Sequence, residues 1–286
     1  MGKVHVCVDF VSPHEDNRIF VYDVLVGLPS MMFLLFLALN FRRSLKKLRQ
    51  SGSEIMSTYF AFLWGVTTLN ILRCLVQLAQ TEETGRSDLW NVLWLFNRFG
   101  TSLLEISVVV FLLQGYTGRQ ALVRTLGISG VLAGLEALIE VIYIFGFNIP
   151  LFLYDNRGIH ADMSWSKWSF WLVHHLIYGI VYLAILLVPY TQWREILPAK
   201  PSFYRYVSLL FVFSLTTVLG SILIGALVNA GYCVYGMASF LYYAGYPPLL
   251  YWTFLSEFFA DQEMELDSYY AEMRDAGYFE DDSFRM

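Results

Sequence analysis

The sequence predicts an all-α membrane protein, a bundle of seven transmembrane helices with its N-terminus outside and its C-terminus in the cytoplasm. Three observations lead to this prediction. The chain is 57% hydrophobic and only 15% charged, with a mean hydropathy of +0.51, whereas soluble domains carry about 25% charged residues. Seven segments are apolar over roughly the 20 residues that a membrane-spanning helix needs. Basic residues are concentrated in alternate linkers, as they are on the cytoplasmic side of a membrane.

The predicted spans follow one another along most of the chain. They cover residues 22–41, 57–79, 91–115, 126–147, 169–190, 206–229 and 233–255. The first 21 residues are mixed polar and carry no evident signal peptide, so we expect the first span to act as its own insertion signal. Pro247 and Pro248 remove two backbone donors and should kink the last span.

The orientation follows from the distribution of Lys and Arg. Ten of these residues fall in the linkers on one side of the predicted membrane and five on the other, and RRSLKKLRQ (42–50) alone has five. We therefore divide the chain into an extracellular segment (1–21), a seven-transmembrane domain (22–255) and a cytoplasmic tail (256–286). The tail holds ten acidic and two basic residues, which predicts a partner site or partial disorder rather than contact with anionic lipid.

Ionisable side chains inside the spans are the main functional signal. Such residues are costly in a membrane, so they usually face the bundle interior and pair with one another. At 1.5 Å per residue, four of them lie about 9–12 Å below the outer face, each on a different span. These four are Arg73, Arg98, Glu140 and His174. Glu105 and Glu136 should lie deeper, near the midplane.

The segment WLFNRFGTSLLEISVV (94–109) carries both Arg98 and Glu105. The two residues are about 10 Å apart along the helix axis, too far to be each other's main partner. We expect Arg98 to pair with Glu140 on the next span, with Arg73 close enough to share that carboxylate. Glu105 has no basic residue at its own depth, so it should be protonated or bonded to hydroxyl groups.

Two interpretations of this polar layer stay open, with a third less favoured. The residues could form a structural network that fixes how the helices pack. They could instead line a water-filled outer cavity that binds a small ligand, and one network can serve both purposes. A proton or ion path is the third interpretation.

The cysteines permit one disulfide outside the membrane. Cys7 and Cys233 both fall on the outer side, where an oxidising environment would let them pair. The alternative is two free thiols. Cys74 lies inside the second span and is interpreted as a packing residue.

Several kinds of chemistry have no signature in the chain. A retinal Schiff base needs a lysine in the last span, but Lys200 is the last lysine. Only His174 and His175 are intramembrane histidines, and adjacent helical residues point about 100° apart, which does not suit a zinc hydrolase. Hydrolase and nucleotide-binding motifs are missing. We expect no enzymatic activity, no cofactor, no metal and no nucleic-acid partner.

Several blocks of sequence resemble the transmembrane-40 family, which includes adipocyte-associated transmembrane proteins and plant candidate G-protein-coupled receptors. These blocks are YDVLVGLPSMMFLLFLAL (22–39), LRCLVQL (72–78), WLFNRFGTSLLEISVVV (94–110), FWLVHHLIYGIVY (170–182), LPAKPSFYRY (197–206), LGSIL (219–223) and FLYYAGYPPLLY (240–251). The resemblance covers roughly residues 22–259, without the tail. It implies a seven-span receptor-like protein and assigns no binding residue.

Together these observations predict a receptor-like signalling protein, a candidate G-protein-coupled receptor that binds an unknown small ligand in the outer polar cavity. A small-solute or proton-coupled transporter, or a membrane scaffold acting through its tail, are the alternatives. The expected partners are the lipid bilayer, the ligand and a heterotrimeric G protein or another cytoplasmic protein. We expect the plasma membrane as its location, with an endomembrane as the alternative.

Overall fold

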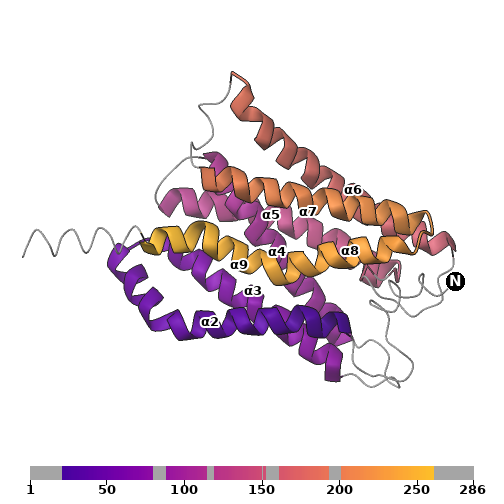
Figure 1. Ribbon diagram of the computed structural model, residues 1–286, viewed down its shortest axis with the longest axis horizontal. Coiled ribbons are helices and arrows are strands. Elements are labelled where there is room, and N and C mark those ends of the chain that lie inside the picture. The colour runs from indigo at the N-terminus through magenta and orange to yellow at the C-terminus, as the bar shows by residue number, and fades with distance from the viewer. Residues whose placement is uncertain are drawn as a thin grey trace, which may run out of the picture.

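A computed structural model describes residues 21–79, 88–114, 119–149, 151–152, 161–192 and 201–260 of the chain. All regular structure in these residues is helical, which confirms the predicted all-α class. The helices form seven successive segments (Figure 1). Six of them are long and apolar enough to cross a membrane.

The segments follow the predicted spans and extend them at several ends. Their bounds are α2 Val21–Ser51, α3 Glu54–Ala79, α4 Asp88–Gln114, α5 Arg119–Val141 with the π-helical turn η2 Ile142–Gly146, α6 Ala161–Leu187 with the 3-10 turn η3 Val188–Tyr190, and α7 Pro201–Gly225. The seventh segment is built from α8 Ala230–Phe240, η5 Leu241–Gly245, α9 Tyr246–Leu250 and η6 Tyr251–Leu255.

The basic stretch 42–50 is helical, which corrects its prediction as a linker. Lys, Arg and Leu are good helix formers, and Leu48 is buried against the bundle, so the helix continues past the apolar span. The chain then reverses within two residues. Gly52 adopts a positive φ of 62°, which suits a glycine after a helix end. The Ser53 hydroxyl accepts the backbone N–H of Met56 at 3.3 Å and caps α3.

The seventh segment is interrupted on both sides of its proline pair. The π-helical turns η5 and η6 flank α9, which contains Pro247 and Pro248. Proline has no N–H to donate, so the regular helical ladder cannot pass through this point. The predicted disturbance is therefore present as two π-helical turns, a rare form that occurs mostly as single turns within α-helices.

The seventh segment closes the bundle. Helices adjacent in sequence pack together for most of the chain, and the last segment also contacts α2, α3 and α7. Figure 1 shows α8 and α9 running between α2 and α7, with α6 leaning away at the far side. Apolar side chains such as Leu28, Met32, Leu39 and Val131 are exposed on the outer surface, as lipid contact requires.

The first and last segments also meet at the end of the bundle where α2 turns into α3. The Lys47 ammonium group donates to the backbone carbonyl of Phe259 at 3.0 Å. The Phe259 ring is buried and packs against Phe60 and Tyr251. The helical backbone continues to residue 260, so the packed domain extends beyond the predicted boundary at 255.

The buried interior has two apolar parts with a polar layer between them. One cluster includes Leu63, Leu104 and Tyr182. The other is largely aromatic and includes Trp94 and Trp171. Along α4 and α6, Arg98 and His174 fall between members of the two clusters, whereas Glu105 lies among members of the first.

Candidate functional site

The guanidinium group of Arg98 lies at the centre of the polar layer. Its Nη2 is 3.0 Å from Glu136 Oε1, and its Nε is 3.3 Å from Glu140 Oε1. The predicted pairing with Glu140 is therefore confirmed, but Glu136 makes the shorter contact. Both acids come from α5, one helical turn apart, so both carboxylates face α4.

His174 completes the surroundings of Arg98 from α6. Its Nε2 is 2.6 Å from Arg98 Nη2. A guanidinium can only donate, so Nε2 is the accepting nitrogen in this contact. The Arg98 guanidinium also lies 5.3 Å from the centre of the Trp171 ring, a cation–π distance. Arg98 is thus held from several directions.

Glu136 joins three helices through its two carboxylate oxygens. Oε1 accepts the Ser102 hydroxyl of α4 at 3.0 Å in addition to Arg98. Oε2 accepts the Tyr178 hydroxyl of α6 at 2.9 Å. Glu136 was expected deeper than Arg98, but it reaches the same level because a glutamate side chain spans most of a helical turn.

Glu105 is held by hydroxyl groups, one of the two states expected for it. The Tyr182 hydroxyl of α6 donates to Oε1, and the Tyr242 hydroxyl of η5 donates to Oε2. The Tyr242 ring also lies 5.7 Å from the Arg98 guanidinium. Tyr242 therefore connects the Glu105 carboxylate and the Arg98 cluster to the interrupted seventh segment.

Arg73 does not share Glu140, which corrects the prediction. Its Nη2 is 4.0 Å from Asp23 Oδ1 at the start of α2 and 3.7 Å from the sulfur of Cys74. The Tyr243 ring centre is 4.9 Å from the guanidinium. Helix α3 packs against α2 as well as α4, so Arg73 is drawn to a partner that we did not predict. The sequence could have indicated this partner, because Asp23 is an acidic residue in the first turn of an otherwise apolar span.

A chain of amide and hydroxyl groups crosses the bundle beside Arg73. The side-chain amide of Asn97 on α4 donates to the side-chain oxygen Oδ1 of Asn70 on α3 at 3.3 Å. The Asn70 side-chain nitrogen in turn donates to the Ser30 hydroxyl of α2 at 2.9 Å. Asn70 also donates to the backbone carbonyl of Tyr243 at 3.3 Å.

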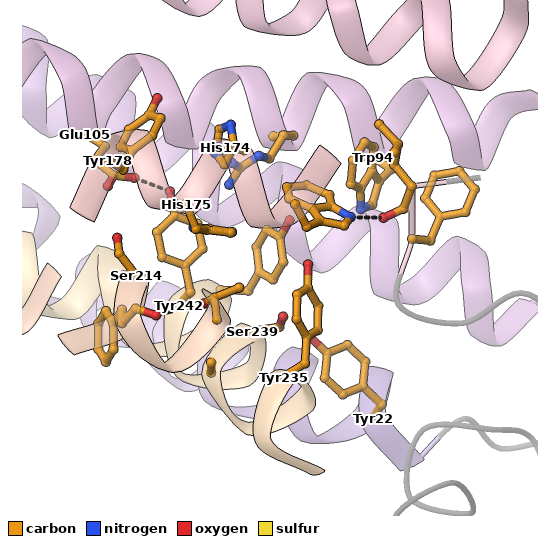
Figure 2. A pocket seen from close by; sticks show the side chains of 18 of the residues that line it. Tyr22, Trp94, Glu105, His174, His175, Tyr178, Ser214, Tyr235, Ser239 and Tyr242 are labelled. Atoms are coloured by element: carbon orange, nitrogen blue, oxygen red, sulfur yellow. Dashed lines mark hydrogen bonds between the residues drawn. The ribbon is translucent and has the colours of Figure 1, made fainter. Parts of the chain in front are cut away.

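A cavity opens beside this network, between the side chains of α2, α3, α4, α6, α7 and α8 (Figure 2). The volume open to the centre of a water molecule is about 70 Å³. Four predicted residues line it, namely Arg73, Arg98, Glu105 and His174. Glu136 and Glu140 are not among its lining residues. A cavity is thus present beside the predicted residues, but Glu140 is fully buried and supports Arg98 instead of bounding the space.

The remaining predicted features fall largely outside the described residues. Cys7 lies there, so its disulfide with Cys233 stays a prediction, as does the role of the tail beyond residue 260. Cys74 is a free and buried thiol that contacts Arg73, in agreement with a packing role. The orientation of the bundle in the membrane also stays a prediction.

Comparison with known proteins places this architecture in a family. The Tmemb_40 family model, described as "Predicted membrane protein", matches residues 15–272. Candidate G-protein coupled receptors 2 and 8 of Arabidopsis thaliana are 39% and 37% identical, over 92% of this chain and 87% and 88% of theirs. A transmembrane protein adipocyte-associated 1 homolog of Caenorhabditis elegans is 27% identical over 83% of this chain and 53% of its own. No solved structure matches the chain.

Proposed function

The chain belongs to the Tmemb_40 family of multi-pass integral membrane proteins, and from this membership we propose that it is a receptor-like signalling protein that binds a small ligand in its central cavity. The observation that carries the proposal is the position of the cavity. Its walls come from most helices of the bundle, including the interrupted seventh segment. A ligand in the cavity would contact several helices of the bundle at once. A signal can cross the membrane only if such helices move relative to one another.

The contacts of Tyr242 supply a physical route for such a signal. This residue lines the cavity, bonds to Glu105, and lies in the π-helical turn next to the proline pair. A ligand that binds one conformation of this turn more tightly than another shifts the equilibrium toward the first conformation. The size of the shift is set by the difference between the two affinities. Relatives in Arabidopsis thaliana carry the name candidate G-protein coupled receptor, which makes a heterotrimeric G protein the first partner to test.

A small-solute transporter is the second candidate function. Transporter binding sites are commonly built where a membrane helix is interrupted near the middle of the bilayer. Here the cavity reaches Glu105 and Tyr242 beside such an interruption. The same observation therefore supports a path through the bundle as well as a ligand site.

One experiment separates the two functions. Small carboxylates, amines, amides and sugars would be applied to cells carrying a G-protein activation reporter, and the same solutes would be used in flux assays on proteoliposomes. We expect activation without flux. Flux without activation would favour the transporter.

A variant that fills the cavity connects either activity to this site. Ser239 lines the cavity, and Ser239→Trp should abolish the response while the protein still reaches the membrane. Ser166→Trp is the matched control, because Ser166 is exposed on α6 and does not line the cavity. A full response from Ser239→Trp would contradict the proposal.

A further inference from the structure

Arg73 has more hydrogen-bonding capacity than its surroundings use. It is 3% exposed, and a guanidinium carries five N–H donors. Its carboxylate contact, with Asp23, is long at 4.0 Å, and its other polar contact is the weakly accepting sulfur of Cys74. Its Nε has no hydrogen-bond partner among the described residues. A buried charge in this condition is costly unless another acceptor arrives.

Arg98 provides the comparison within the same cavity. Its guanidinium has carboxylate contacts at 3.0 Å and 3.3 Å and a histidine contact at 2.6 Å. The acids are also occupied, because Glu136 accepts from Arg98 and two hydroxyls, and Glu105 accepts from two tyrosines. Both arginines keep N–H donors without a partner among the described residues, but Arg98 has two close carboxylates whereas Arg73 has only the long contact with Asp23. Of the two, Arg73 is therefore the one whose charge lacks a close carboxylate in the described part of the chain.

The cavity that Arg73 lines suits a flat apolar body. Aromatic rings line it, including Trp90, Trp94 and Phe152. In Figure 2 the side chains of Tyr22, Tyr235 and Ser239 lie around the same space, with the hydroxyl of Tyr235 directed into it. Rings favour offset or edge contacts with another ring, and hydroxyls can bond to a polar substituent.

We propose that the cavity binds a small carboxylate with a flat apolar body, and that Arg73 holds its carboxylate in place of Asp23. A guanidinium and a carboxylate match through two parallel hydrogen bonds, which Asp23 does not make at its present distance. A cationic ligand would lie beside the positive charge of Arg73, whose one carboxylate contact among the described residues is long. The inference rests on the proposed function, because it names the ligand class of the same cavity.

Three matched probes test the charge of the ligand. Phenylacetate, phenylacetamide and 2-phenylethylamine have the same ring and similar length but are anionic, neutral and cationic. Binding to the full chain in lipid nanodiscs would be followed by calorimetry. We expect binding of phenylacetate only. Arg73→Gln should weaken it about tenfold or more, since hydrogen bonds to a charged group contribute about 1.5–3 kcal/mol.

Asp23→Asn separates a binding role of Arg73 from a structural one. It removes the carboxylate that competes for Arg73, so phenylacetate should bind several-fold more tightly. This variant keeps the test valid if Arg73→Gln does not fold. Arg124→Gln is the control, because Arg124 is exposed on α5 and does not line the cavity, and it should leave binding unchanged.

Several results would overturn the inference, and they are distinct from failure of the proposed function. Tighter binding of the amine or the amide would reject the carboxylate class but leave the cavity as a ligand site. Weaker phenylacetate binding by Asp23→Asn, or no binding of phenylacetate to the wild type, would also reject it. The Ser239→Trp experiment tests the cavity itself, whatever the class of ligand.

Discussion

The side-chain amide of Asn70 donates to the backbone carbonyl of Tyr243 at 3.3 Å, across the interface of α3 and the seventh segment. The residues four and five positions after Tyr243 are Pro247 and Pro248. These are the positions whose N–H groups would bond to that carbonyl in an α-helix or a π-helix, and proline has none. Asn70 therefore replaces the donor that the proline pair removes.

Asn70→Ala should destabilise the folded protein. The substitution leaves the Tyr243 carbonyl without this donor and breaks the chain from Asn97 to Ser30, and an unsatisfied buried group costs about 1–3 kcal/mol. Thermal unfolding in detergent measures the effect. Asn40→Ala is the control, because Asn40 is part-exposed and its amide bonds within its own helix. An equal loss in both variants would contradict the assigned role of Asn70.

Restoring the missing donor should reduce the importance of Asn70. Pro247→Ala returns a backbone N–H at the α-helical position for the Tyr243 carbonyl. We expect Asn70→Ala to cost less in the Pro247→Ala background than in the wild type, as a double-mutant cycle would measure. Equal costs in the two backgrounds would mean that the amide and the proline act independently.

Arg98→Gln should strongly lower the yield of folded protein. It leaves Glu136 and Glu140 without their cation, and breaking a buried pair costs about 3–5 kcal/mol in soluble proteins. Adding Glu140→Gln should recover part of the loss. Folded yield after gel filtration is the measurement, with Arg124→Gln as the exposed arginine control. Normal yield of Arg98→Gln would show that the cluster does not stabilise the bundle.

Glu105→Gln should be mild for folding and affect signalling instead. Glutamine keeps an oxygen that can accept from Tyr182 or Tyr242, so the buried hydroxyls retain a partner. The double variant Tyr182→Phe with Tyr242→Phe should be less stable, because it leaves the carboxyl without these donors. Thermal unfolding compares them. Greater loss from Glu105→Gln would mean that the charge of this residue is structural.

The Cys7–Cys233 disulfide is tested by peptide mapping under non-reducing conditions. We expect one peptide that contains both cysteines when the protein is isolated from native membranes. Because the bond encloses most of the chain, the loop-entropy contribution would be about 5 kcal/mol. This figure is an upper guide, since the membrane already restricts the unfolded chain. Recovery of both residues as free thiols would reject the bond.

The orientation of the bundle has a direct test. A reporter fused after Met286 should be cytoplasmic, and one placed before Met1 should be exterior, because the basic residues of 42–50 stay on the cytoplasmic side. Protease protection of each reporter in sealed vesicles measures this. Opposite labelling would place the cavity mouth on the cytoplasmic side.

Depth along a helix could be predicted from the sequence, whereas direction around it could not. Residue spacing placed Arg98 and Glu140 at one level, and the structure pairs them. Spacing says nothing about which neighbour a helix face meets, so Arg73 was assigned to Glu140 when it faces Asp23 on α2. The direction of a side chain around its helix also decides whether the residue lines the cavity or supports it from behind.

The contacts made by tyrosines were also beyond prediction from the sequence. Tyr182 shares a helix face with His174, which the spacing shows, but Tyr242 reaches Glu105 from 137 positions away. Such a contact depends on how the seventh segment is rotated, and η5 changes that rotation. The helical state of 42–50 was missed for another reason, because positive charge identifies the side of the membrane and does not end a helix.

The length of α2 has a consequence for how the protein sits in its bilayer. Its 31 residues form a rod about 46 Å long, whereas the hydrocarbon layer is about 30 Å thick. In the predicted orientation the surplus is the basic end, which would stand among the cytoplasmic headgroups, where each Lys or Arg gains about 1 kcal/mol from anionic lipid. Lys47 bonds the same rod to the end of the seventh segment. A change in leaflet charge or thickness that tilts the rod would therefore pull on the helix that carries Tyr242, and make the cavity sensitive to the composition of the membrane around it.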